Sequence, residues 1–304
     1  MSIALHPLAA SDLESWRSIA AHPTLAAQFP QLLEPRGPES KLADPFFRPS
    51  LCWLACRDGV LVGFLYTFVL EGPAGPWGAM RIGVTGDHRR RGVGSALLER
   101  ALRGLEDEIG RAEAAVSAWL PSPGASEFAG RHGFRPDRTF WEMERPPSPA
   151  PEVAWPRGVE ARNFDSSDRQ YQDWCDAYHR SFAENYRPVQ VTVEQVRAML
   201  ARPTFAPDGV MLAYRDGACV GFCRTSLQPH SGEVAILGVV PEARGIGLGR
   251  ALLRWGVRWI ADAGAATSDL LVDGDNENAL RLYRSEGFAV KRTPNAPEEV
   301  NNGQ

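Results

Sequence analysis

The sequence lacks the features that would place the protein in a membrane or on a nucleic acid. No segment approaches the roughly 18 uninterrupted apolar residues of a membrane span, and the chain does not open with a basic region followed by an apolar block. We therefore expect no membrane partner, no secretory signal and a cytoplasmic location. The formal net charge is −4 and there is no basic run, so no nucleic-acid partner is expected either. The charge weakly favours a cationic substrate.

Cysteine is also scarce. The 304 residues include five cysteines, and the pairs Cys52/Cys56 and Cys219/Cys223 have neither a zinc spacing nor the spacing of a redox CxxC motif. We expect small buried cysteines and no metal site. The chain does have many apolar residues, 44% of the total, and its length favours two domains.

One segment, residues 237–253 (LGVVPEARGIGLGRALL), predicts a phosphate-binding turn. An apolar run before it suits a buried strand, and the residues after it have the periodicity of an amphipathic helix. The glycines between them allow a polyanion to approach the backbone, and the first N–H groups of the helix have no intrahelical partners. The residues expected to bind the anion are Leu237, Gly238, Val239, Arg244, Gly245, Ile246, Gly247, Leu248, Gly249 and Arg250.

The spacing Arg-x-x-Gly-x-Gly separates this turn from two common nucleotide motifs. It matches neither G-x-G-x-x-G nor G-x-x-x-x-G-K-[ST], so it supports neither a dinucleotide nor ATP. It resembles the acetyl-CoA pyrophosphate loop of the GNAT acyltransferase superfamily. A second segment, residues 270–288 (LLVDGDNENALRLYRSEGF), resembles the strand, helix and Gly-Phe turn that follow in that family. The resemblance implies acetyl-CoA as cofactor, with Asn276 contacting it and Tyr283 near the thioester sulfur.

The two halves of the chain repeat each other. CRDGVLVGF matches YRDGACVGF, and RRRGVGSALL matches RGIGLGRALL. The matched landmarks are Asp58 and Asp216, Arg89 and Arg244, and Gly133 and Gly287, at separations of 158, 155 and 154 residues. The repeat adds a second set of expected cofactor-binding residues, which are Val84, Arg89, Arg91, Gly92, Val93, Gly94 and Ser95.

A proline-rich connector, Arg145–Gly158, divides the halves. We predict an N-terminal domain over residues 1–150 and a C-terminal domain over 151–304. The family resemblance implies an α/β (α+β) fold, with two tandem GNAT domains that each contain a mixed, mostly antiparallel twisted sheet flanked by helices. The second half is one strand short relative to the first, so either the tail or the other half is expected to complete its sheet.

Local signals add detail to this plan. Asp-Gly pairs at residues 58–59 and 216–217 predict hairpins. Ser11, with Glu14 three residues on, predicts a capped helix, and Thr192 predicts the cap of a second helix that ends at Leu200. Gly83 and Gly238 interrupt the strand before each loop, which indicates either a bulge or close backbone approach, or merely tight packing.

Acyl transfer from a thioester to an amine requires a base, donors for the oxyanion and an acid for the thiolate. Tyr283 suits the acid, since a phenol with a pKa near 10 can donate to a thiolate. Glu233, at the entry of the strand before the loop, suits the base, either directly or through one water. The alternatives are a packing tyrosine and a surface glutamate. The backbone N–H groups of residues 237–239 are the expected oxyanion donors.

Other polar residues near this region have simpler interpretations. Asp273 and Asp275 are expected to form turns and caps, and His179 and His230 to be structural or surface groups. In the first half, Ala129 stands where the second has Tyr283, and Gly78 stands where it has Glu233.

These substitutions in the first half predict that only the second half is catalytic. Ser122 replaces Asn276 there as well. We predict an acetyl-CoA-dependent N-acetyltransferase acting on a small amine or amino-acid-like substrate, as a monomer or homodimer. Tandem members of this superfamily include one that acetylates a cysteinyl pseudodisaccharide. The alternatives are a CoA-binding sensor or scaffold without turnover, and an acetyltransferase of a protein or peptide N-terminus.

Overall fold

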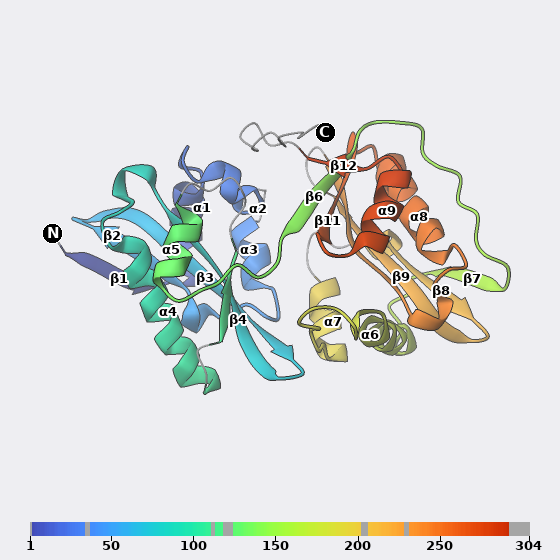
Figure 1. Ribbon diagram of the computed structural model, residues 1–304, viewed down its shortest axis with the longest axis horizontal. Helices are drawn as coiled ribbons and strands as arrows, with labels where there is room; N and C mark the ends of the chain where they lie inside the picture. The colour runs from blue at the N-terminus through green and yellow to red at the C-terminus, as the bar shows by residue number, and fades with distance from the viewer. Residues whose placement is uncertain are drawn as a thin grey trace, which may run out of the picture. The chain divides into compact units, whose positions relative to one another are not determined.

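A computed structural model describes residues 2–33, 37–110, 113–117, 124–201, 206–227 and 231–291. Up to the connector the elements are β1 (Ile3–Pro7), α1 (Leu13–Ala20), α2 (Pro30–Leu33), α3 (Gly37–Leu42), β2 (Trp53–Arg57), β3 (Val60–Gly72), β4 (Gly75–Val84), α4 (Val93–Ile109), β5 (Ala114–Val116), α5 (Ala125–Arg131) and β6 (Phe140–Arg145). After it come β7 (Val159–Asn163), α6 (Asp168–Phe182), α7 (Val193–Leu200), β8 (Val210–Arg215), β9 (Ala218–Leu227), β10 (Ser231–Val239), α8 (Leu248–Asp262), β11 (Thr267–Asp273), α9 (Glu277–Ser285) and β12 (Ala289–Val290). Figure 1 shows their course.

Two mixed sheets carry the fold, as predicted. Within the described residues, the first has five strands in the order β1-β2-β3-β4-β5, and the second has seven in the order β12-β6-β11-β10-β9-β8-β7. Strands β4 and β5 pair in parallel, as do β10 and β11. The antiparallel pairs include β1–β2, β2–β3, β7–β8, β8–β9, β9–β10, β6–β11 and β6–β12.

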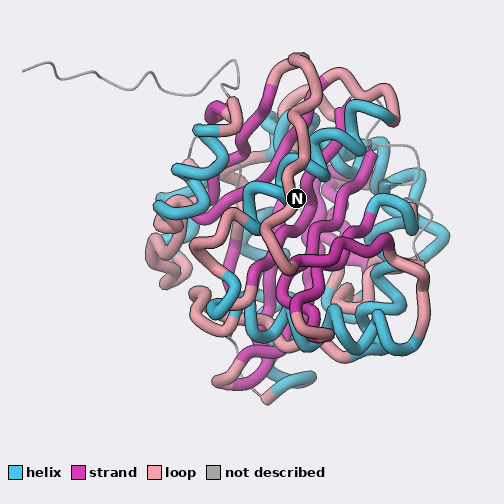
Figure 2. Tube along the Cα trace, turned by 90° about the vertical axis from the view of Figure 1, so that its right-hand side faces the viewer, coloured by secondary structure: helices cyan, strands magenta, loops and turns pink. Residues whose placement is uncertain are grey.

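Helices cover both faces of each sheet. In the first unit α4 packs on one face, where its leucines join a core with Met80, and α1 lies on the other with Trp16. In the second, α8 and α9 lie on one face and α6 and α7 on the other (Figure 1). Figure 2 shows the helices flanking the strands. Packing is close, since a Cβ on Gly232 would lie 2.3 Å from Cγ2 of Ile260.

Strand β6 belongs to the second sheet although it precedes the connector. Contacts divide the chain into one unit with residues 2–70 and 75–137 and another with 71–74 and 138–291. Met143 of β6 is fully buried and pairs with Leu270 of β11. The other half thus supplies the strand that the second half lacked, which was one of the two predicted sources. The packing division lies at Asp137/Arg138, whereas the sequence placed the boundary near residue 150, because proline content marks the connector and not the strand before it.

Both predicted hairpins form. Asp58 and Gly59 have φ of 50° and 80°, and Asp216 and Gly217 have φ of 51° and 80°. Two consecutive residues with positive φ are typical of the type I′ turn, whose twist suits paired strands.

The predicted N-terminal cap was wrong, whereas a later one is present. A 3-10 turn precedes α1, which begins at Leu13, and Oδ2 of Asp12 accepts the Ala9 N–H at 2.8 Å, so Ser11 does not cap this helix. Thr192 caps α7 by accepting the Gln195 N–H at 3.2 Å.

Two further expectations concern the described residues only. All five cysteines are free; four are buried and Cys56 is half-buried, as expected for small apolar groups. Within the described part of the chain, no helix combines the length and apolarity needed to cross a bilayer.

Candidate active site

The glycine-rich loop opens α8 with an uncovered helix N-terminus. Gly245 and Gly247 have φ of 79° and 89°, which L side chains rarely adopt, and a Cβ on either would meet no atom within 4 Å. Gly247 precedes Leu248, the first residue of α8, and no side chain caps the helix. The first-turn N–H groups therefore face open space with the positive end of the helix dipole behind them. This arrangement suits the pyrophosphate of acetyl-CoA.

Arg244 fastens this loop to its surroundings. Its Nε donates to the carbonyl oxygen of Val239 at 3.2 Å, and Nη2 donates to that of Ser181 at 3.0 Å. Its Nη1 donates to the carboxylate of Glu184 at 2.9 Å. The guanidinium thus joins the end of β10 to the last turn of α6. These bonds support the loop, and the predicted contact of Arg244 with the cofactor stays a prediction.

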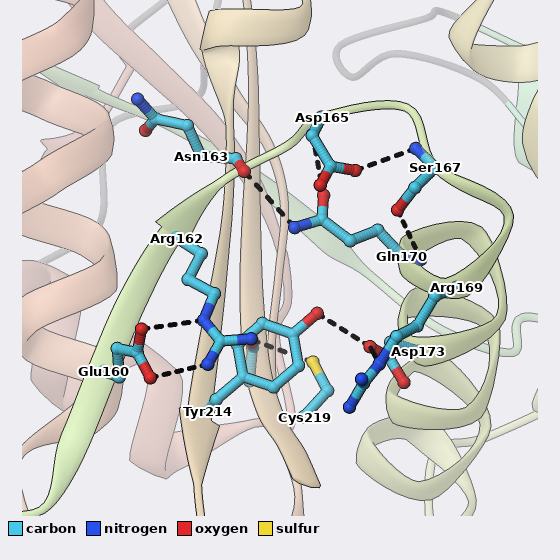
Figure 3. A network of polar contacts seen from close by, with 11 residues as sticks. Glu160, Arg162, Asn163, Asp165, Ser167, Arg169, Gln170, Asp173, Tyr214 and Cys219 are labelled. Carbon is cyan, nitrogen blue, oxygen red and sulfur yellow. Dashed lines mark hydrogen bonds and ion pairs between the residues drawn. The ribbon is translucent and has the colours of Figure 1, made fainter. Parts of the chain in front are cut away.

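Helix α6 is itself fixed to the sheet by the polar network of Figure 3. The hydroxyl of Tyr214 on β8 donates to Asp173 on α6 at 2.8 Å. The guanidinium of Arg162 lies 4.5 Å from the centre of the Tyr214 ring and pairs with Glu160 on the same strand. Helix α6, whose last turn holds the loop, is therefore anchored to the edge of the sheet through Asp173, two turns earlier.

Arg250 faces a protein carboxylate. It pairs with Glu286, which also pairs with Arg254 at 2.8 Å. Burial opposes ionisation of Glu286, but the two arginines hold its pKa below the usual value. In the first half, Ser95 and His132 take the equivalent places and share a 2.9 Å hydrogen bond. Each pair links the loop helix to the end of the next helix.

The first-half loop has the same backbone form. Gly92 has φ of 82° and precedes Val93, the first residue of α4. The Nε of Arg89 donates to the carbonyl oxygen of Val84 at 3.1 Å, as Arg244 does to Val239. A Cβ on Gly94 would lie 3.2 Å from the ring of Phe128. The retained conformation keeps open the prediction that these residues bind acetyl-CoA.

Two other members of the predicted sets are exposed to solvent. Arg91, in the first loop, is exposed to solvent. Ile246, at the matching place in the second loop, is 39% exposed. Ile246 sits between two glycines at which a Cβ would meet no atom, whereas a Cβ on Gly92, beside Arg91, would lie 3.7 Å from Ile3. Both side chains are exposed and so accessible to a ligand.

Strands β10 and β11 separate before the chain reaches the loop. Their pairing ends at Glu233 and Asp269, after which β11 continues against β6. The irregularity in β10 lies between Val234 and Ile236. The bulge anticipated near Gly238 is therefore found earlier in the strand. Gly238 instead makes room for an aromatic ring, because a Cβ there would lie 2.5 Å from Phe222. Leu237, Gly238 and Val239 follow the separation, where oxyanion donors were predicted.

Glu233 and Tyr283 come from opposite faces of this sheet. Glu233 lies on the α6 face and accepts the Ser226 hydroxyl at 3.3 Å. Tyr283 lies on α9, with its ring centre 6.1 Å from that of Phe288. Burial, with a smaller effect of Cys223, raises the pKa of Tyr283 to about 12. The phenol is therefore protonated at neutral pH.

The remaining predicted residues have mainly structural contacts. Oδ1 of Asn276 accepts the Ala279 N–H at 3.1 Å and caps α9, which leaves its amide NH₂ for a ligand. Asp273 accepts the Asp275 N–H at 3.0 Å, as expected for a turn. His179 accepts the Val191 N–H at 3.1 Å. The positions of His230 and Ser122 lie outside the described residues.

Sequence reasoning missed a group of charges beside Glu233. Lys291 follows β12, and its Nζ lies 3.1 Å from Glu142 and 3.4 Å from Glu144, both on β6. It also lies 3.7 Å from Asp269 of β11. The placement of β6 in the second sheet creates this group, so no motif could reveal all of it. Asp269 alone could have been found from its place in the strand after the loop.

The two sheets, the parted parallel strands and the open helix N-terminus define an acetyltransferase of the acetyl-CoA-dependent type. The profile of the acetyltransferase (GNAT) family matches residues 16–134 and 169–288. A mycothiol acetyltransferase of Thermomonospora curvata is 39% identical over 238 residues, 77% of each chain. One of Catenulispora acidiphila is 32% identical over 249 residues, 77% of this chain and 76% of that one.

A solved structure has the same fold over nearly the whole chain. The GCN5-related N-acetyltransferase from Sphaerobacter thermophilus superposes with a TM-score of 0.73 and 22% identity, covering 95% of this chain and 92% of that one. The protein belongs to the GNAT acetyltransferase family, as a tandem member that uses acetyl-CoA.

Proposed function

We propose that the protein transfers the acetyl group of acetyl-CoA to a primary amine of a small molecule, and that the second half performs the reaction. The observation that carries this proposal is the asymmetry between halves. Glu233 and Tyr283 flank the region of the parted strands, whereas the first half has Gly78 and Ala129 at the matching places. Both halves keep the loop, but the first half has neither a carboxylate at the place of Glu233 nor a phenol at the place of Tyr283.

Each of the two residues has one task in this proposal. Acetyl-CoA supplies the acetyl group as a thioester. Glu233 accepts a proton from the ammonium, directly or through one water, so that the amine nitrogen can attack the carbonyl carbon. As the C–N bond forms and the C–S bond breaks, Tyr283 donates its proton to the departing sulfur, so that CoA leaves as the thiol. The nitrogen loses its second proton to solvent, and the phenolate regains a proton from solvent. With its raised pKa the phenol remains a donor and is not a competing anion.

The proposed acceptor is the amine of a cysteinyl pseudodisaccharide, the precursor of mycothiol. Support comes from the relatives named mycothiol acetyltransferase, which cover about three quarters of this chain at 32–39% identity. The tandem arrangement with one depleted half is similar to that of mycothiol synthase. Two broader readings remain alternatives, namely a CoA-binding sensor without turnover and an enzyme that acetylates peptide N-termini.

The test measures CoA released from acetyl-CoA, separated by chromatography because the cysteinyl acceptor has a thiol of its own, with a panel of amines that includes cysteinyl glucosaminyl inositol, simple amino acids and peptides. We expect the cysteinyl pseudodisaccharide to give the highest kcat/KM. Tight acetyl-CoA binding without thiol release on any amine would favour the sensor, and peptide turnover above that of the small amines would favour the N-terminal enzyme.

The assignment of residues has its own test. Tyr283→Phe keeps the ring packing and deletes the donor, so kcat should fall about 10- to 1000-fold with little change in acetyl-CoA affinity. Glu233→Gln should lower kcat by a similar factor. A fully active Tyr283→Phe protein would remove the tyrosine from the mechanism.

A further inference from the structure

Asp269 stands beside Glu233 on the neighbouring strand. The two residues are register partners in the parallel pair β10–β11, and theirs is the last pair before the strands separate. Parallel partners place their side chains on the same face, and neighbouring strands are about 4.8 Å apart. Asp269 therefore lies next to the proposed base.

The carboxylate of Asp269 has spare capacity to accept a hydrogen bond. Its side chain is 14% exposed, and its Oδ1 is buried without a hydrogen-bond partner among the described residues. Lys291 approaches the other oxygen at 3.7 Å, a distance of weak pairing. Burial raises the pKa of this carboxyl, against the lowering effects of Lys291 and of the Ser231 side chain. A buried acceptor of this kind is costly unless something binds it.

The internal repeat shows whether the fold itself requires the carboxylates of Glu233 and Asp269. In the first sheet, Gly78 and Ala114 are register partners in the parallel pair β4–β5. They lie 155 residues before Glu233 and Asp269, the same separation as Arg89 and Arg244. The strand pair forms there without either carboxylate. Both are absent together from the half that lacks the proposed acid, which links Asp269 to the reaction and not to the fold.

We propose that Asp269 binds the ammonium group of the acceptor and holds it against Glu233. The inference rests on the proposed function at the same site. An ammonium has three N–H donors, and one carboxylate cannot satisfy them all while also taking a proton. Asp269 accepts one N–H from its side of the gap, and Glu233 takes the proton that is lost. The site thereby selects a primary ammonium over a neutral group of similar size.

The test compares two probes that differ in the amine alone, cysteinyl glucosamine and its deaminated analogue 3-mercaptopropionyl glucosamine. Calorimetry on the full chain with CoA present should show wild type binding the amine more tightly. Asp269→Asn keeps the shape and removes the charge, so affinity for the amine should fall about 10- to 100-fold, while affinity for the analogue should change little. KM for acetyl-CoA and the melting temperature should stay near wild type.

Two variants separate this role from support of Lys291. Glu144→Gln removes another carboxylate held by Lys291, and we expect no more than a twofold change in amine affinity. Lys291→Met frees Asp269 from its cation, so amine affinity should rise. Equal loss in Asp269→Asn and Lys291→Met would mean that Asp269 serves only the ion pair and would overturn the proposal.

The experiment distinguishes failure of the proposed ammonium site from failure of the proposed reaction. Equal affinities of the wild type for the two probes, or no saturable binding of either, would overturn the ammonium site. A probe that binds through Asp269 but releases no thiol from acetyl-CoA would leave the ammonium site standing and count against the proposed reaction.

Discussion

Arg244 and Val239 are joined by a hydrogen bond of 3.2 Å from guanidinium Nε to carbonyl oxygen, and Arg89 and Val84 repeat it at 3.1 Å. In both halves the arginine thus joins its loop to the end of the strand before it. The arginine that opens the motif therefore determines where the glycines lie, and through them the free N–H groups of the following helix.

Arg244→Lys should weaken acetyl-CoA binding about 10-fold, because a lysine ammonium cannot reproduce three directed bonds from one planar group. The loop should lose its fixed position while α8 stays folded. Calorimetric titration with CoA measures the effect. Arg258→Lys, which alters an exposed pair with Asp262 on the same helix, is the control and should leave affinity unchanged. Wild-type affinity in Arg244→Lys would show that the glycines set the loop alone.

Gly247→Asp should bind acetyl-CoA at least about 10-fold more weakly than Gly247→Asn. Both side chains are strained at φ of 89°, and Asn and Asp have nearly the same shape, so their difference isolates the charge placed at the pyrophosphate. The same pair of changes at Gly92 should leave turnover within a few fold. Equal binding by the two Gly247 variants would show that the pyrophosphate does not bind at this loop. Loss of turnover confined to Gly92→Asp would show that the first half is the catalytic one.

Met143→Ala should destabilise the second unit by about 2–5 kcal/mol, the usual cost of truncating a fully buried side chain. Denaturant unfolding with hydrogen exchange on β11 measures it. Phe140 lies on the same strand but is 54% exposed, so Phe140→Ala should cost much less. An undisturbed β11 in Met143→Ala would mean that β6 is not part of this sheet's core.

Glu286→Gln should lower stability at pH 7 by about 1–2 kcal/mol, since the amide cannot pair with Arg250 and Arg254. The pKa of Glu286 is lowered in the fold, so its contribution is present above the ordinary glutamate pKa and is lost as pH falls through the lowered value. The gap between wild type and variant should therefore close in acid. Urea unfolding between pH 3 and pH 7 checks this, and a gap that widened in acid would contradict the ion pairing. Asp262→Asn, in the exposed pair with Arg258, should show little gap at any pH.

Local signals were sufficient for much of the fold. The Asp-Gly turns formed because positive φ at two consecutive positions is a property of those residues and needs no distant partner. The glycine loops and their helices also followed from short-range spacing, as did the helix that begins after Thr192. Ser11 failed as a cap because its neighbour Asp12 makes the competing bond to Ala9.

Other features depended on residues far apart in the chain. The place of Gly238 is explained by the ring of Phe222, and the carboxylate of Glu286 meets Arg250 from 36 residues away. Neither contact can be predicted from a short segment of the sequence. The pairing of Glu233 with Asp269 is of the same kind, since register between parallel strands is set by the helix that crosses between them.

The sequence by itself determined the repeat, the family and which half has Glu233 and Tyr283, because these are read from residue identities at matched positions. Only the tertiary structure decided that β6 enters the second sheet, that Arg244 supports the loop and that Asp269 lies beside Glu233. The physical reason is that strand insertion and register are chosen by burial of whole faces, here Met143 against Leu270, and a face is assembled from segments more than 100 residues apart.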